Sequence, residues 1–310
     1  MKRIIFLLVL LSITTTNAKV WRVDKNTANN PDFTSLQEAH NAASAGDTIY
    51  IAGHGNSYGS LHINKQIVII GTGYFLEQNL DKGVNPFESK LDLIVFKNGA
   101  ENSIIMSCTV GYIEIQCNNI IIKRNKILGA GGNYAVYIYG DARSGIIVQQ
   151  CFIKAGIKLN GDNFLITNNF ILGSQNAYLG PSALLLSTSG SIRNNVISGY
   201  EDVYGAVLEN NIFIDGISRI TNCIERNNIV GEQNSLFTLT GNEDAKYILK
   251  DGSPAKGAGV NGVDCGMFGG DEPYILSGIP PIPTIYEAVV PSTVTNKDGL
   301  PIKIKARTNK

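Results

Sequence analysis

The chain has 310 residues with 26 basic and 26 acidic side chains, so its formal net charge is zero. A chain without a basic excess offers no electrostatic support for binding nucleic acid or an anionic membrane. Charged residues make up 17 % of the sequence and glycine occurs 33 times, which suits short strands joined by tight turns.

The first residues have the features of a secretory signal. Lys2 and Arg3 precede an apolar run, residues 4–11, that is too short to span a bilayer. Cleavage is expected after Ala18. The sequence therefore predicts a secreted protein (periplasmic, cell-surface or extracellular) whose mature chain contains no membrane span.

One amphipathic helix is predicted near the start of the mature chain. Ser35 and Glu38 have capping-box spacing, apolar residues recur at intervals of three or four, and Gly46 is the expected stop. Strands are expected at 48–51 and 66–70. A stack of coils exposes an open apolar end at its first rung, and a helix of this kind can cover it.

The middle of the chain repeats a short phrase: apolar, polar, Asn, Asn, apolar, apolar. Its second Asn position falls at 125, 151, 169, 195, 211 and 228, so the steps are 26, 18, 26, 16 and 17 residues long. Each step is close to one coil of a solenoid, and no helical pattern lies between the copies. The Asn pairs are interpreted as a ladder at a tight bend in each coil, with one residue of the pair left-handed.

Several segments resemble the right-handed parallel β-helix proteins of the pectin-lyase-like superfamily. The resemblance rests on residues 32–39, 45–51 and 63–71 near the start and on 252–259 and 266–270 near the end. It implies an all-β fold, a right-handed parallel β-helix (solenoid) with an N-terminal capping helix.

Three segments are expected along the chain: a signal peptide at 1–18, the β-helix domain at 19–279, and a Pro-rich linker with a tail at 280–310. The tail contains two strand-like runs, 284–290 and 300–306. The tail is expected either to fold back along the solenoid or to form a small hairpin. Packing on the body is favoured, because a lone hairpin is marginal in water.

Alternation along the predicted strands directs tyrosines and polar side chains outward in the central coils. Outward aromatic rings can stack on sugar rings, although they also fill outer faces without any ligand. The candidate substrate-binding residues are Tyr134, Tyr137, Tyr139, Lys158, Tyr178, Tyr200, Asp202 and Tyr204.

Asp141 and Asp162 each follow a Gly after equivalent strands, so they are expected to stack in adjacent coils, with Arg143 nearby. Polysaccharide lyases of the superfamily use carboxylates and a basic residue, so the resemblance implies Asp141, Asp162 and Arg143 as catalytic candidates. The plainer interpretation is that Gly-Asp forms a turn. Glu201 with Asp202 is a second acidic candidate, or a solvated loop.

No cofactor follows from the residues themselves, and calcium is the candidate that the resemblance implies. The five cysteines match no metal spacing and favour small buried groups, with a Cys108–Cys117 bridge as the open alternative.

The resulting functional expectation is a secreted protein that binds polysaccharide or cell-surface glycan. If it is an enzyme, it is a polysaccharide lyase or a glycoside hydrolase. The alternative is a non-catalytic cell-surface or adhesion solenoid, and the oligomeric state does not follow from the sequence.

Overall fold

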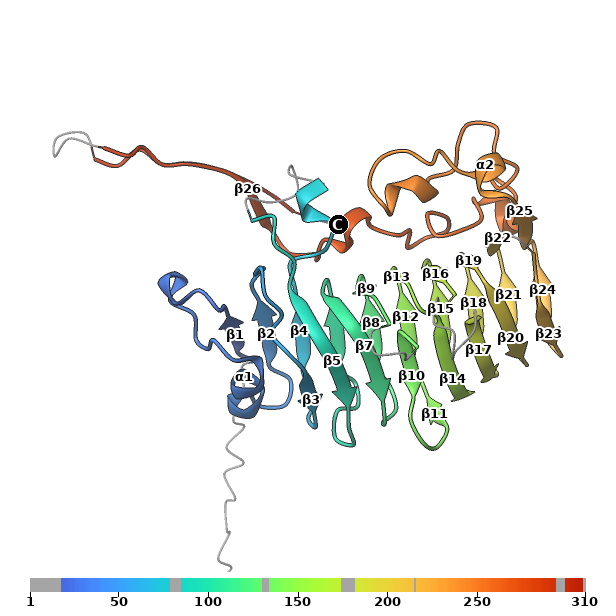
Figure 1. The fold of residues 1–310 in the computed structure, drawn as a ribbon, viewed down its shortest axis with the longest axis horizontal. Coiled ribbons are helices and arrows are strands. Elements are labelled where there is room, and N and C mark those ends of the chain that lie inside the picture. Colours follow the sequence, from blue (N-terminus) through green and yellow to red (C-terminus); the bar gives the residue numbers. More distant parts are fainter. Residues whose placement is uncertain are drawn as a thin grey trace, which may run out of the picture.

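A computed structural model describes residues 18–78, 85–129, 134–173, 182–214, 216–293 and 299–308. Over these residues the chain is an elongated stack of parallel strands (Figure 1). The architecture confirms the predicted parallel β solenoid. The signal segment before Ala18, Tyr178 and most of the inserted loop around it lie outside the described residues.

The first sheet contains ten strands among the described residues, one from each rung. In spatial order they are β1 (Val20–Val23), β2 (Thr48–Ile51), β4 (Val68–Ile70), β6 (Ile104–Met106), β8 (Ile121–Lys123), β12 (Ile147–Gln149), β15 (Leu165–Thr167), β18 (Ser191–Arg193), β21 (Val207–Glu209) and β24 (Ile224–Arg226).

The second sheet contains 15 strands of the described chain and supplies two strand positions per rung. One position holds β10 (Val136–Ile138), β14 (Ile157–Asp162), β17 (Ser182–Thr188), β20 (Tyr200–Tyr204) and β23 (Arg219–Thr221). The other holds β9 (Lys126–Ile127), β13 (Phe152–Ile153), β16 (Phe170–Leu172), β19 (Val196–Ser198), β22 (Ile212–Ile214) and β25 (Ile229–Gly231). The long strand β7 (Thr109–Ile115) runs through both positions, and β3 (Leu61–Ile63), β5 (Lys90–Phe96) and β11 (Arg143–Ser144) complete the sheet.

Identical register positions in successive rungs form apolar columns inside the solenoid. In the first sheet one such column is Ile122, Val148, Ile166, Ile192 and Leu208, each at most 1 % exposed. Each buried side chain of this size contributes about 1.5–3 kcal/mol relative to its exposed state. The alternation that buries these residues turns their sequence neighbours outward.

The second Asn of each pair forms the predicted ladder. Asn195 is fully buried, and its Oδ1 accepts hydrogen bonds from the backbone N (3.0 Å) and Nδ2 (3.0 Å) of Asn169 in the preceding rung. Asn195 Nδ2 donates in turn to Oδ1 of Asn211 at 2.9 Å. The ladder interpretation is therefore confirmed, and the amides satisfy one another in the interior.

The first Asn of each pair has a different structural role. Asn168, Asn194 and Asn210 have φ of 55°, 54° and 56°, the left-handed region that Asn tolerates. Their side chains reach the returning segment 232–279, as when Asn168 Nδ2 donates to the Gly269 carbonyl at 2.7 Å. This segment packs over the outer side of β13, β16, β19 and β22 and completes a second apolar core (Figure 1).

Short helical pieces accompany the strands. Helix α1 (Leu36–Ala42) is N-capped by Ser35, whose Oγ accepts from Glu38 N at 3.4 Å. The helix ends at Ala42, earlier than predicted. Helix α2 (Gln233–Leu236) and the 3₁₀ turns at Thr27–Asn29, Leu76–Gln78, Ala245–Tyr247, Val260–Gly262 and Leu276–Gly278 are shorter still.

The tail does not pack on the body as expected. Strands β26 (Thr284–Val289) and β27 (Lys303–Arg307) pair antiparallel with each other and form a separate sheet. In Figure 1 this hairpin projects past the β1 end of the solenoid. Its large apolar side chains stay exposed, so burial against the body does not hold it.

All five cysteines are described, and all are free. The Cys108–Cys117 bridge left open by the sequence is therefore not formed. Four are buried, and burial raises the pKa of the Cys151 thiol to about 12 and that of Cys265 to about 11. They behave as small core groups.

Candidate functional site

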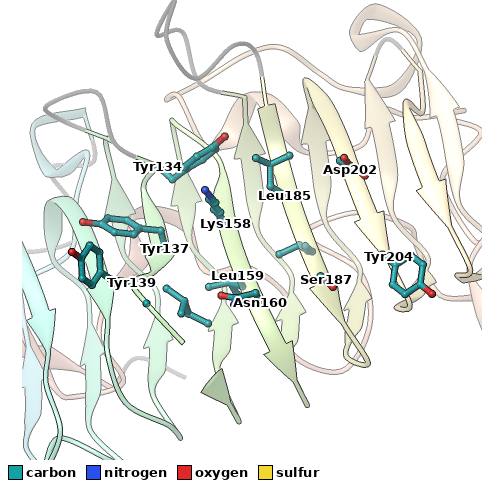
Figure 2. Close-up of a pocket in the computed structure, with 13 residues that line it drawn as sticks. Tyr134, Tyr137, Tyr139, Lys158, Leu159, Asn160, Leu185, Ser187, Asp202 and Tyr204 are labelled. Carbon is teal, nitrogen blue, oxygen red and sulfur yellow. The ribbon is translucent and has the colours of Figure 1, made fainter. Parts of the chain in front are cut away.

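An open groove lies on the outer face of the second sheet and has a volume of about 820 Å³. Figure 2 shows Tyr134, Tyr137 and Tyr139 at one end, Asp202 and Tyr204 at the other, and Lys158 between them. The complete lining is Tyr134, Tyr137, Ile138, Tyr139, Gly140, Lys158, Leu159, Asn160, Leu185, Leu186, Ser187, Asp202 and Tyr204.

Strand register explains why these residues meet. Tyr137 pairs with Lys158, Lys158 with Leu185, and Leu185 with Asp202, so one outward row crosses β10, β14, β17 and β20. A second row is formed by Asn160, Ser187 and Tyr204. Neighbouring strands lie about 4.8 Å apart, so the rows present one side chain per rung along a rigid face.

Aromatic rings form the end of the groove at β10. Tyr137 stacks on Tyr112 of β7, with ring centroids 6.2 Å apart and an interplanar angle of 25°. The Tyr137 hydroxyl donates to Glu114 Oε2 at 2.6 Å, which orients the ring. Burial, reinforced by Glu114, raises the pKa of Tyr137 well above its usual value, so it remains a neutral donor. Tyr139 is 63 % exposed and offers its ring to solvent.

The charges in the groove are unevenly matched. Asp202 Oδ2 lies 3.5 Å from Nη1 of Arg219 in the next rung, so this carboxylate already has a cationic neighbour. Lys158 has no carboxylate partner among the described residues. Its Nζ lies 5.8 Å from the centroid of the Tyr134 ring, a weak cation–π contact. Lys158 is therefore the charge most available to an anionic ligand.

The predicted catalytic residues lie at the end of the same strands but outside the groove lining. Asp141 and Asp162 are exposed, and Arg143 is half-buried. The register pairs Arg143 with Gly161 and Ser144 with Asp162, whereas Tyr137 pairs with Lys158.

The expected stacking of Asp141 on Asp162 is therefore wrong. The offset between paired residues falls from 21 at Tyr137 to 18 at Arg143, so three extra residues before β11 displace Asp141. Asp162 instead accepts a hydrogen bond from Ser189 Oγ at 3.1 Å.

Glu201 is neither a groove residue nor a solvated one. It is fully buried, its Oε2 accepts from Ser218 N at 3.1 Å, and its Oε1 has no hydrogen-bond partner in the described chain. Burial raises the pKa of this carboxyl to about 6. Tyr200, next to it, is 37 % exposed and does not line the groove.

A second hollow of about 480 Å³ lies beside the first, over β5 and β7. The two hollows meet at the stacked pair of Tyr112, which lines the second, and Tyr137, which lines the first. Sequence reasoning missed Tyr112 and Glu114, although their alternation in 109–115 matches that of Tyr137 and Tyr139. It also missed Asn160, Leu185 and Ser187, which the same alternation turns outward.

In the described chain, the side chains that could bind calcium do not lie close together. No cluster of three or more His, Cys, Asp or Glu side chains that could hold a metal ion occurs in the described part of the chain. Asp141 and Asp162, the carboxylates implied by the resemblance, are not opposite one another. Within the described residues, Asp141 and Asp162 therefore do not form a calcium site.

No protein-family model matches the chain, and a search of curated proteins finds no match. The pectin-lyase-like resemblance therefore rests on segments of this chain alone. Across the described residues, no helix is both long and apolar enough to cross a membrane.

Proposed function

We propose that this chain is a secreted, right-handed parallel β-helix protein of the pectin-lyase-like type that binds extracellular polysaccharide in the groove of β10, β14, β17 and β20. The observation that carries the proposal is the composition of that groove. Tyrosine rings flank one lysine that lacks an acidic partner among the described residues, on a face held rigid by strand pairing. Sugar rings stack on aromatic faces, and a lysine favours acidic sugars.

Binding without cleavage is the second candidate, and the position of the carboxylates favours it over a cutting enzyme. Paired carboxylates flank the bond that a glycoside hydrolase breaks. Asp202 is the one carboxylate in the described lining, and Arg219 lies beside it. In this form the solenoid is a non-catalytic surface or adhesion protein that displays a glycan-binding face.

Helix α1 fits the role of an N-terminal cap in this proposal. Its Leu36 and Ala39 are buried in the core that also holds Ile49 and Leu61 of the first rungs. The helix would then shield the first rung from water and from pairing with other chains. The signal at 1–18 would direct export.

The test is binding of the full chain to acidic and neutral oligosaccharides, measured by calorimetry after a glycan-array screen. Lys158→Ala should weaken binding of acidic glycans roughly tenfold or more, and Tyr139→Ala should weaken both classes by a similar factor. Tyr200→Ala is the matched control, because Tyr200 is an exposed tyrosine of the same sheet outside the groove.

Turnover is measured on the same glycans as new reducing ends and as ultraviolet absorption of unsaturated products. Binding with turnover supports an enzyme, and binding without turnover supports the non-catalytic form. Failure to bind any glycan, or equal losses in Lys158→Ala and Tyr200→Ala, would refute the assignment of the groove.

A further inference from the structure

The buried carboxylate of Asp47 accepts three hydrogen bonds where the first rung meets the segment that follows helix α1. The residue is 5 % exposed and directly precedes β2. Its Oδ1 accepts from the backbone N of Lys19 at 2.8 Å, and its Oδ2 accepts from Trp21 Nε1 at 2.9 Å and from Ser44 N at 2.9 Å. One side chain therefore connects β1, the start of β2 and the chain that leaves α1.

All three donors are neutral, although the acceptor is charged. Burial alone would raise the pKa of Asp47, but the donated hydrogen bonds and the Coulombic attraction of Lys19 lower this pKa below its ordinary value. The carboxylate is therefore ionised at neutral pH. No basic side chain of the described chain forms an ion pair with it. Lys19 Nζ lies over the Trp21 ring instead, 3.2 Å from the ring centroid. Hydrogen bonds alone thus offset the desolvation of this charge.

The nitrogen that donates to Oδ1 is also the first nitrogen after the expected cleavage point of the signal. A peptidase of the export machinery would hydrolyse the peptide bond between Ala18 and Lys19. The oxygen of one water goes to the Ala18 carbonyl, which leaves as a carboxylate, and the protons go to the Lys19 nitrogen. An α-amino group has an ordinary pKa of about 8, so this nitrogen is an ammonium at neutral pH. The cation that Asp47 lacks would then arise 2.8 Å from its Oδ1.

We propose that cleavage after Ala18 creates an α-ammonium on Lys19 that pairs with Asp47 and stabilises the first rung of the mature chain. This inference rests on the export proposed above and is independent of glycan binding. The ion pair requires no movement of the chain, because 2.8 Å is already the length of a charge-assisted N–H···O contact. The Lys19 carbonyl accepts from Thr48 N at 2.8 Å, so the new terminal residue is held at both its nitrogen and its oxygen.

The first rung is the place where such a pair should have a clear effect. Strand β1 is at the edge of its sheet, because β2 is its one neighbour among the described strands of that sheet. Chain ends open locally at little cost in free energy unless contacts hold them. A charge-assisted hydrogen bond is roughly twice as strong as a neutral one. The processed chain should therefore hold β1 more tightly than a chain that keeps an N-terminal extension.

The first experiment identifies the N-terminus of the exported protein. The full chain is expressed with its own signal, and the exported product is analysed by intact mass and by N-terminal sequencing. The expected first residue is Lys19. Any other first residue would overturn the proposal together with the signal assigned to residues 1–18.

The second experiment compares two chains produced without the signal, as fusions to a removable N-terminal domain. One chain starts at Lys19, and the other keeps Ala18, so that its Lys19 nitrogen remains an amide. Hydrogen exchange should show the amides of β1 protected roughly tenfold more strongly in the chain that starts at Lys19. Asp47→Asn should abolish this difference, because it keeps the shape of the side chain without its charge.

Asp32→Asn is the matched control. Its Oδ2 also accepts a backbone N–H of β1, from Arg22 at 2.8 Å, three residues beyond the proposed terminus. The difference between the two chains should therefore persist in this variant. A difference that persists equally in Asp47→Asn would overturn the ion pair.

A third measurement needs no substitution. Acylation by N-hydroxysuccinimidyl acetate at neutral pH requires a free, unprotonated amine, and pairing with a carboxylate favours the protonated form. The α-amine of the chain that starts at Lys19 should react roughly tenfold more slowly than that of the chain that keeps Ala18, as peptide mapping by mass spectrometry would measure. Equal acylation rates, or equal hydrogen exchange in β1, would overturn the ion pair and leave the signal assignment intact. Failure to bind glycan would affect neither.

Discussion

Glu201 should make the protein less stable as the pH rises from about 4 to about 8. Its carboxyl is fully buried in β20, where Oε2 accepts from the backbone N of Ser218 and Oε1 has no partner among the described residues. Burial disfavours the charged form and raises the pKa from its ordinary 4.5 to about 6. The folded state therefore binds a proton more tightly than the unfolded state does.

The sign and size of this pH effect on the unfolding free energy follow from the linkage between proton binding and folding. Below the unfolded pKa of 4.5 the carboxyl is protonated in both states and has no effect on stability. Above the folded pKa of about 6 it is charged in both states, and the buried charge costs about 2 kcal/mol of unfolding free energy. The unfolding free energy therefore decreases as the pH rises from 4.5 to about 6.

Denaturant unfolding followed by circular dichroism, at several pH values, measures the effect. Glu201→Gln keeps the shape without the charge, so it should be about 2 kcal/mol more stable than wild type near pH 8 and nearly equal near pH 4. Amide hydrogen exchange in β20 should show the same pH-dependent difference locally. Glu232→Gln, at an exposed position, is the control. A Glu201→Gln difference that does not change with pH would refute the reasoning.

Three further predictions concern the ladder, the second hollow and the thiols. Asn195→Ala removes a fully buried amide that bonds both neighbouring rungs, so unfolding free energy should fall by about 3 kcal/mol or more, whereas the exposed Asn41→Ala should change it by about 0.5 or less. If a glycan binds the groove, Tyr112→Ala should weaken the binding of long oligosaccharides roughly tenfold and leave the binding of short ones unchanged. Calorimetry with a series of oligosaccharide lengths would measure this difference. A thiol reagent should label Cys223, the one half-buried cysteine, much faster than the four buried ones, and reductant should not alter gel mobility.

The sequence predicted the fold through its repeated Asn pairs. The second Asn is fully buried and hydrogen-bonded at positions 125, 169, 195 and 211, and Cys151 takes its place in one rung. It therefore recurs at one register position and marks the coil boundaries. The spacing of the repeats did not predict the hydrogen-bond partners of the first Asn side chain. Its partners, such as the carbonyls of Met267 and Gly269 for Asn168, come from a segment about 100 residues later. Long-range docking of this kind has no local signal.

Site residues were placed correctly where side chains alternate inward and outward without interruption along the strands, and wrongly where an insertion breaks the strand register. Tyr137, Lys158 and Asp202 lie in one outward row because β10, β14, β17 and β20 keep their register there. Asp141 does not lie opposite Asp162, because three extra residues precede β11, and a shared Gly-Asp pair does not reveal such an insertion. Glu201 was predicted to be a second acidic candidate beside Asp202 or part of a solvated loop, but the alternation of β20 places its side chain inside.

The outward row through the groove also indicates which residue best tests for function. Glu114, Tyr137, Lys158, Leu185, Asp202 and Arg219 follow one another across six rungs. At one end Glu114 accepts from Tyr137, and at the other Asp202 lies beside Arg219.

Lys158, in the middle of this row, has no oppositely charged neighbour in the described part of the chain, and a surface lysine without an ion-pair partner adds little to stability. Lys158→Ala should therefore leave unfolding unchanged within about 0.5 kcal/mol and affect ligand binding alone. A large loss of stability in this variant would mean that the lysine serves the fold and that the groove lacks its anionic ligand.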